Sequence, residues 1–191
     1  MNDTLRIAAG LESLGTLALR TAARADEVAP IVDAMRRCLA SGGTLFFAGN
    51  GGSAADAQHI AAEYVVRYHP AQRRALRAIA LTTDSSILTA AGNDFGFDQV
   101  FARQLAALAR AGDLVCLHST SGNSGNCVVA AEAARALGVT TVAFLGQDGG
   151  ALRGAVDFAF VIDDARVNHI QEIHLALQHQ IAAILTAEFG E

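Results

Sequence analysis

The sequence has little of what secreted or metal-thiolate proteins need. It contains three cysteines, two prolines and no tryptophan in 191 residues. The cysteines are too few and too widely spaced for a disulfide framework or a CxxC metal site, so they indicate a reducing compartment. None of the three cysteines has the neighbours of a catalytic nucleophile.

Long apolar runs and positive charge are also scarce. Although 52% of the residues are hydrophobic, no run reaches the roughly 20 apolar residues that cross a bilayer. The N-terminus lacks the basic start and apolar block of a signal peptide. A net charge of −5 argues against non-specific nucleic-acid binding, which needs a basic face. We expect neither a membrane nor a nucleic acid as a partner.

The sequence does contain an alternation of apolar runs and helical patterns. Apolar residues at three- and four-residue steps predict two helices over residues 4–40. Strands are predicted at 44–48, 77–81, 114–118, 140–145 and 158–162. Continuous apolar strands separated by helices are typical of a parallel sheet covered on both faces. We predict a three-layer α/β fold in one domain, residues 1–191, with residues 1–41 as a helical N-terminal extension.

Further helices are predicted between and after these strands. Ser53 can cap a helix that runs to about Arg67. Other helices are expected at about 98–110, 124–137 and 167–188. The segment Gly92-Asn93-Asp94-Phe95-Gly96 has the composition of a loop.

The segment Ser119-Thr120-Ser121-Gly122-Asn123-Ser124 lies directly between a strand and a helix. In such sheets ligands bind at the carboxyl ends of strands, where a helix N-terminus offers free N–H groups. Four hydroxyl side chains exceed what helix capping needs, although a hydroxyl-rich cap is the alternative. No lysine is present, so this is not a nucleotide P-loop. We predict that the segment binds a phosphorylated small molecule.

A second junction, Gly49-Asn50-Gly51-Gly52-Ser53, follows the first predicted strand. It brings the Asn50 and Ser53 side chains to the same edge of the sheet. Its GxGxxA pattern also fits a dinucleotide-binding fingerprint, which requires an acidic residue about 20 positions later. The equivalent strand ends only at Asp84. Dinucleotide binding therefore stays an alternative.

His59 and Glu63 lie four residues apart, on one face of the helix after this junction. Ile60, Val65 and many alanines indicate that the helix is largely buried, so a Glu there needs a partner or a chemical role. The pair suits metal ligation or acid–base chemistry, and a surface salt bridge is the alternative. The last helix is rich in imidazole and amide groups, with Gln171, His174, Gln178 and His179.

Together these motifs resemble the sugar isomerase (SIS) domain family and, within it, the phosphoheptose isomerases. The resemblance covers nearly the whole chain. Besides the two junctions it is carried by Asp56-Ala57-Gln58-His59, Glu63, Gly92-Asn93-Asp94-Phe95-Gly96-Phe97, Asp148-Gly149-Gly150, and Ile170-Gln171-Glu172-Ile173-His174 with His179. Each motif alone is weak, whereas their order and spacing together are highly specific.

The resemblance implies an isomerase that converts sedoheptulose 7-phosphate into D-glycero-D-manno-heptose 7-phosphate through an enediol, on the way to heptose for lipopolysaccharide or other glycoconjugates. It also implies a cytoplasmic homotetramer with one zinc ion per subunit. Carried over from the family, the metal ligands are His59, Glu63, Gln171 and His179, and the acid–base pair is Glu63 and His179. The substrate contacts are Asn50, Gly51, Gly52, Ser53, Glu63, Asn93, Asp94, Ser119, Thr120, Ser121, Ser124 and Gln171.

The chemistry of these residue types agrees with that assignment. Aldose–ketose isomerisation needs one base that moves a proton between C1 and C2, and a second group that moves protons between the oxygens. Glu63 and His179 suit these roles, with a metal that polarises the carbonyl. Gln171 and His179 are eight residues apart, about 12 Å along one helix. One ion can hardly bind both from one chain, so we expect sites shared between subunits.

Two other interpretations within the same fold stay open. One is a non-enzymatic SIS protein that binds the bacterial replication initiator, which shares Gln58-His59; the presence of Glu63 and His179 favours an enzyme. The other is an isomerase of another sugar phosphate. The chain departs from the family pattern at Asn168 and His169, where an acid and an arginine are expected, and this departure bears on substrate preference.

Overall fold

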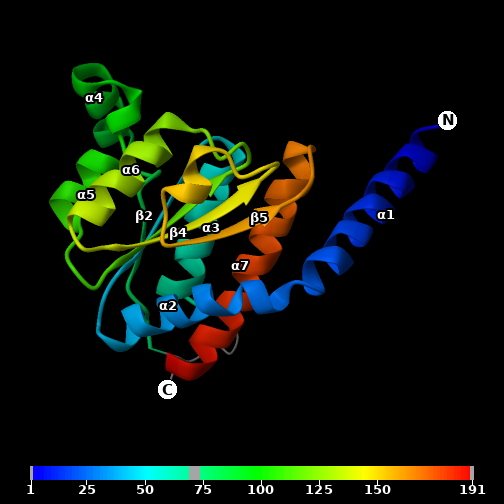
Figure 1. The fold of residues 1–191 in the computed structure, drawn as a ribbon, viewed down its shortest axis with the longest axis horizontal. Coiled ribbons are helices and arrows are strands. Elements are labelled where there is room, and N and C mark those ends of the chain that lie inside the picture. Colours follow the sequence, from blue (N-terminus) through cyan, green and yellow to red (C-terminus); the bar gives the residue numbers. More distant parts are fainter. Residues whose placement is uncertain (1, 69–73, 190–191) are drawn as a thin grey trace.

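A computed structural model describes residues 2–68 and 74–189 (Figure 1). At its centre lies a sheet of five strands in the order β2-β1-β3-β4-β5. The strands are β1 (Leu45–Gly49), β2 (Ala78–Ala80), β3 (Leu114–Ser119), β4 (Thr140–Gly146) and β5 (Phe158–Ile162). Every pairing between neighbours is parallel, so the predicted parallel sheet is confirmed.

Helices cover both faces of this sheet. One face packs against α2 (Ala29–Ala40), α3 (Gly52–Val65), α7 (Val167–Phe189) and the end of α1 (Asp3–Ala22). The other packs against α4 (Ser85–Phe95), α5 (Ala102–Leu108) and α6 (Gly125–Ala136). Single 3-10 turns occur at Ala25–Glu27, Phe97–Gln99 and Ala151–Gly154. The three-layer α/β fold is confirmed.

The central strands are mostly apolar because their alternate side chains enter two separate cores. Phe47 and Cys116 face α2, α3 and α7, whereas Phe46 and Val115 face α5 and α6. All four side chains are at most 1% exposed. A strand that is buried on both faces has a nearly continuous run of apolar residues, and the sequence shows this pattern at β1 and β3.

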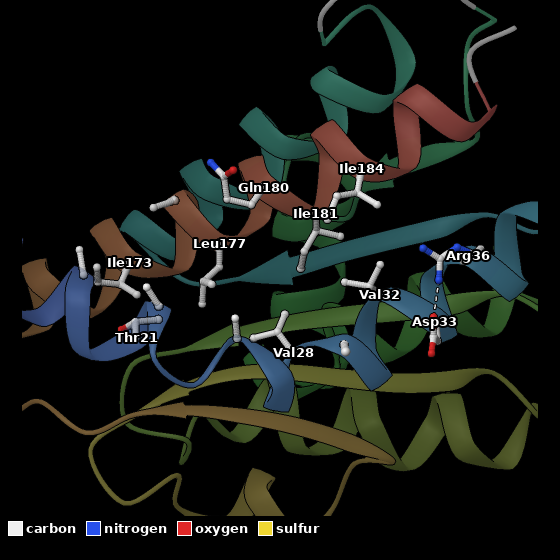
Figure 2. Close-up of a pocket in the computed structure, with 15 residues that line it drawn as sticks. Thr21, Val28, Val32, Asp33, Arg36, Ile173, Leu177, Gln180, Ile181 and Ile184 are labelled. Atoms are coloured by element: carbon white, nitrogen blue, oxygen red, sulfur yellow. Dashed lines mark hydrogen bonds and ion pairs between the residues drawn. The ribbon is translucent and has the colours of Figure 1, made fainter.

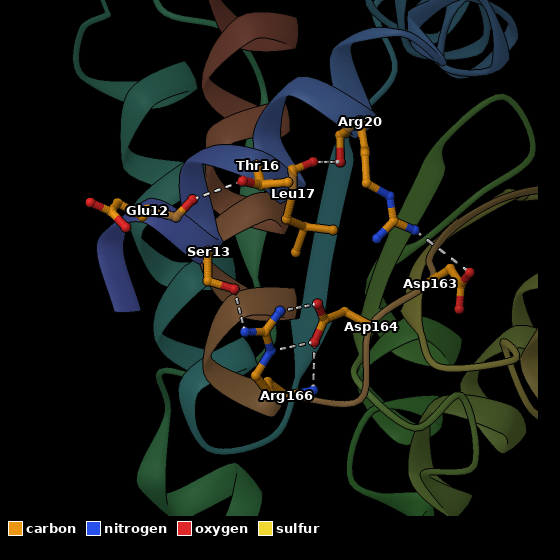
Figure 3. Close-up of polar contacts among 9 residues, drawn as sticks. Glu12, Ser13, Thr16, Leu17, Arg20, Asp163, Asp164 and Arg166 are labelled. Atoms are coloured by element: carbon orange, nitrogen blue, oxygen red, sulfur yellow. Dashed lines mark hydrogen bonds and ion pairs between the residues drawn. The ribbon is translucent and has the colours of Figure 1, made fainter. Parts of the chain in front are cut away.

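Helix α1 projects from the body of the molecule (Figure 1). Only Leu17 and Thr21 are buried along it, and its other large apolar side chains are mostly exposed: Leu5 55%, Ile7 65%, Leu11 64% and Leu19 75%. Figure 3 shows how its second half is held to the loop before α7. Arg166 binds Asp164 at 2.6 Å and Ser13 at 2.5 Å, and Arg20 lies 3.8 Å from Asp163.

The predicted loop at Gly92–Gly96 is wrong, because residues up to Phe95 belong to α4. The carboxylate of Asp84 accepts a hydrogen bond from the N–H of Ile87 at 3.0 Å and caps the helix, and Gly96 ends it with a φ of 88°. The prediction was based on the Gly, Asn and Asp content of the segment and did not include the N-cap at Asp84. None of the described helices is long and apolar enough to cross a membrane.

Candidate active site

Strands β1 and β3 are neighbours in the sheet, although β2 lies between them in the sequence. The chain therefore turns in opposite directions after β1 and after β3, and the two following loops diverge. In open α/β sheets, ligands bind in the crevice at this switch point. The junction 49–53 follows β1 and the segment 119–124, which we call the phosphate loop, follows β3. Both predicted substrate loops thus lie at one sheet edge.

Two amide side chains join these loops. The Nδ2 of Asn50 donates to the Oδ1 of Asn126 at 2.9 Å, and the Nδ2 of Asn126 donates to the Oδ1 of Asn50 at 2.8 Å. Asn126 is buried in the first turn of α6. The pair fixes the loop after β1 against the helix after the phosphate loop. Sequence reasoning missed Asn126, because a single Asn near a helix start carries no signal of such a partner.

Hydrogen bonds within the phosphate loop orient the hydroxyl groups of its serines. The Oγ of Ser119 accepts from the N–H of Gly122 at 3.1 Å and lies 3.1 Å from the Oγ of Ser124. The Oγ of Ser121 accepts from the N–H of Asn123 at 3.2 Å. Ser124 is the N-cap residue of α6, but its side chain makes no capping bond. The loop is a preorganised turn at a helix N-terminus, as anion binding requires.

A neighbouring turn, Asp148-Gly149-Gly150, supports the phosphate loop. Gly122 has a φ of 66°, and a Cβ there would lie 1.9 Å from the carbonyl oxygen of Gly149. The carbonyl oxygen of Gly122 accepts from the N–H of Leu152 at 3.0 Å. The two backbones approach so closely that only glycine fits between them. The Asp-Gly-Gly motif of the sequence thus has a structural role next to the predicted ligand.

Helices α3 and α7 pack side by side and run in the same direction. The first residue of α3 is Gly52, and a Cβ there would lie 2.5 Å from the Oε1 of Gln171. Seven residues further along α3, the Nε2 of His59 lies 2.8 Å from the Nε2 of His179. The N-cap of α3 is Gly51, so the predicted Ser53 cap is wrong. With φ at 57°, Gly51 starts the helix two residues earlier, and Ser53 is buried in its first turn.

His59, Glu63 and His179 form a group that could hold a metal ion, which we call the metal group. One ligand atom from each lies within 4.8 Å of the others, and the Oε1 of Glu63 is 3.5 Å from the Nε2 of His59. The ring of His179 stacks on Tyr68 with 5.7 Å between centroids. Burial lowers the pKa of His179, the charge of His59 lowers it further, and Glu63 opposes both. Neutral imidazole is the form that binds a metal.

The structure does not bring all the predicted site residues to the metal group. Gln171 lies beside Gly52 at the substrate loops, about 12 Å along α7 from His179. Asn93 and Asp94 lie exposed on α4, where the amide of Asn93 donates to the carboxylate of Asp94 at 2.8 Å. Figure 1 shows α4 at the outer end of the molecule, beyond α5 and α6. A single chain therefore leaves the predicted site in separate parts.

Comparison with known proteins shows the family to which the chain belongs. The SIS domain signature matches residues 12–146. A phosphoheptose isomerase from Akkermansia muciniphila is 43% identical over 187 residues, which are 98% of this chain and 95% of that protein. The solved phosphoheptose isomerase from Francisella tularensis has a TM-score of 0.92 at 34% identity, covering 97% of this chain and 98% of that one. The one from Neisseria gonorrhoeae has a TM-score of 0.89 at 38% identity, covering 97% and 100%.

A parallel sheet in this strand order, with a hydroxyl-lined loop at its switch point, is an α/β architecture that binds ligands at the carboxyl ends of its strands. The sequence match makes the chain a member of the SIS-domain family. Within that family it belongs to the phosphoheptose isomerases.

Proposed function

We propose that this sugar-phosphate isomerase converts sedoheptulose 7-phosphate into D-glycero-D-manno-heptose 7-phosphate. The observation that carries the proposal is that one chain combines a preorganised phosphate loop with a group containing a carboxylate and two imidazoles. The reaction belongs to the cytoplasmic synthesis of heptose for lipopolysaccharide or another glycoconjugate. The whole chain, residues 1–191, acts as a single SIS domain that includes the helices of residues 1–41.

The proposed chemistry uses Glu63 and His179. The carboxylate of Glu63 removes a proton from C1 of the ketose, which leaves an enediol, and returns the proton to C2. The imidazole of His179 moves the hydroxyl proton between O1 and O2, so that the carbonyl passes from C2 to C1. Burial keeps His179 neutral near pH 7 by lowering its pKa, and a neutral imidazole can both accept and donate a proton.

The donor set of the metal group fits zinc. Two imidazole nitrogens and one carboxylate are a frequent ligand set of catalytic zinc, which keeps a further position for substrate. Zinc bound there would polarise the substrate carbonyl. His59 would hold the ion together with Glu63 and His179, one ion per subunit. Gln171 lies with the substrate loops of its own chain, so as a fourth ligand it would have to come from another subunit.

Removal of the metal tests this assignment. We expect dialysis against a chelator to lower kcat at least tenfold, and zinc to restore it, because a bound metal would stabilise the negative charge that develops on the enediolate. Bound zinc is measured by mass spectrometry, and the fold by circular dichroism before and after dialysis. A metal-free protein with full activity would contradict the zinc assignment.

We further propose a homotetramer in which subunits share their sites. The imidazole of His59 is 47% exposed, so the metal group opens to the surface, where a second chain can close it. An apolar hollow of about 510 Å³ lies between α1, α2 and α7. In Figure 2, Val28, Val32, Leu177 and Ile181 point into it. With the exposed leucines of α1, this hollow provides apolar surface for contact between subunits.

Charge on α1 is expected to disrupt the assembly. We expect the double variant Ile7→Asp/Leu11→Asp to form smaller species than the wild-type protein in light scattering, because the carboxylates would be buried without partners. Glu12→Gln, on the same exposed helix, is the matched control and should leave the molar mass unchanged. An unchanged mass for the double variant would exclude α1 from the subunit contacts.

The function itself is tested by incubating the metal-loaded protein with sedoheptulose 7-phosphate in D₂O. We expect the aldose 7-phosphate to form without any nicotinamide cofactor. It should carry deuterium at C2 to the extent that the protonated carboxyl group of Glu63 exchanges with D₂O before it returns its proton, and NMR detects this deuterium. Arabinose phosphates and hexosamine phosphates serve as competing substrates. If the protein does not convert the heptulose phosphate but converts another sugar phosphate, the proposal is overturned in favour of a different isomerase. If it converts none of them, the proposal is overturned in favour of a non-enzymatic SIS protein.

A further inference from the structure

A cluster of polar side chains is buried between β3 and α7. His118 on β3 is 1% exposed, and Cys116 on β3 with His174 and Gln178 on α7 are each 0% exposed. The Nε2 of Gln178 lies 3.0 Å from the Nε2 of His118 and 3.1 Å from the Sγ of Cys116. Burial of polar groups costs stability unless they are well paired. A contact between a helix and a sheet can be made by apolar residues alone, so apolar packing does not account for this cluster.

The direction of the hydrogen bond follows from the chemistry of its atoms. An amide nitrogen can only donate, so the Nε2 of His118 must accept and carry no proton. Burial, with the nearby His174, lowers the pKa of His118 to about 3, which keeps the ring neutral. His174 uses its own Nε2 on the carbonyl oxygen of Leu145 at 3.0 Å. That bond connects α7 to β4, whereas Gln178 connects α7 to β3 through His118 and, more weakly, through the thiol of Cys116.

The two bonded residues occupy particular places in the chain. His118 directly precedes Ser119, where the phosphate loop begins, and Gln178 directly precedes His179 of the metal group. Consecutive Cα atoms are about 3.8 Å apart, so the bond joins the strand and the helix next to both halves of the site. An apolar contact alone allows a helix to shift along a sheet, whereas one buried polar pair can specify a single register.

We propose that the hydrogen bond from Gln178 to His118 is a positioning device that sets the distance between the phosphate loop and His179. It would thereby set the length of sugar phosphate that the enzyme accepts. The substrate-length part of this inference rests on the proposed function. Neither residue is a metal ligand or a member of the phosphate loop, so both act through the residues that follow them.

Three variants test the inference. Gln178→Met keeps the length and approximate volume of the side chain but removes the donor. The double variant His118→Phe/Gln178→Met removes both partners of the hydrogen bond, so neither is left buried without a partner. This variant tests the inference even if the single variant folds poorly. Thr186→Val is the matched control, because Thr186 is a buried polar residue on the same helix whose hydroxyl donates to the carbonyl oxygen of Ala182.

We expect both Gln178 variants to bind zinc at least tenfold more weakly in competition with a chromophoric chelator, because the residue that follows position 178 is a metal ligand. Their preference for a seven-carbon over a six-carbon ketose phosphate, measured as the ratio of kcat/KM values, should fall at least fivefold, with a larger change in kcat than in KM. Thr186→Val should match the wild-type protein in both measurements.

The two measurements separate the inference from the proposed function. Zinc affinity needs no substrate, so it tests the positioning even if the heptulose phosphate is not converted. If the double variant keeps the zinc affinity and the substrate ratio of the wild-type protein, the proposal is overturned, because the contact between α7 and β3 would then keep its register without the hydrogen bond. An equal loss in Thr186→Val would also overturn it, since any buried polar substitution on α7 would have the same effect.

Discussion

Replacement of Glu63 by Gln is expected to lower kcat by about 10²- to 10⁴-fold, the usual contribution of a general base. Gln has the same shape but cannot accept the C1 proton. In the structure the Glu63 carboxylate lies 3.5 Å from His59 and is 22% exposed, so it is accessible to a ligand. The rate is measured by NMR as conversion of sedoheptulose 7-phosphate, together with the exchange of the C1 proton in D₂O.

Because Glu63 is also a proposed metal ligand, this variant must be assayed with its zinc content known and at saturating zinc. Glu132→Gln is the control, since Glu132 is an exposed carboxylate on α6. It should leave kcat unchanged. A zinc-loaded Glu63→Gln variant that keeps more than a tenth of the wild-type kcat would assign the base to another residue.

Replacement of Gly122 by Ala is expected to reduce kcat/KM at least tenfold, mainly through KM, and to destabilise the fold by about 2 kcal/mol or more. A side chain in the left-handed region costs roughly 1–2 kcal/mol, and the new Cβ would lie 1.9 Å from the carbonyl oxygen of Gly149. The phosphate loop and the 148–150 turn must move apart to relieve this contact. The measurements are KM for the heptulose phosphate and the free energy of unfolding in urea.

Gly15→Ala provides the matched control for this substitution. Gly15 lies inside α1, and a Cβ there meets nothing within 4 Å. Ala is favoured over Gly in a helix by about 1 kcal/mol, so this variant should be as stable as the wild-type protein or more so, with an unchanged KM. If Gly122→Ala behaved in the same way, the close packing of the two turns would have no part in substrate binding.

The sequence by itself determined the layers of the fold and the positions of the two predicted substrate loops. Both depend on short-range signals: continuous apolar runs mark β1 and β3, and glycine with hydroxyl residues marks the turns that follow them. The i, i+4 spacing of His59 and Glu63 likewise places two side chains that could hold a metal on one helix face. Where such signals competed, the prediction failed. The cap at Asp84 outweighed the turn-forming composition of Gly92–Gly96 and made that segment helical.

Only the tertiary structure decided which faces of distant elements meet. Gln171 and His179 lie on one helix, yet the packing of α7 along α3 places Gln171 beside Gly52 and His179 beside His59. No pattern in the sequence indicated that Asn50 pairs with Asn126 or that Gly122 lies against Gly149. The physical reason is that a helix face or a turn is specified by residues a few positions apart. The register between two elements depends instead on side chains more than a hundred positions apart, as in the pairing of His59 with His179.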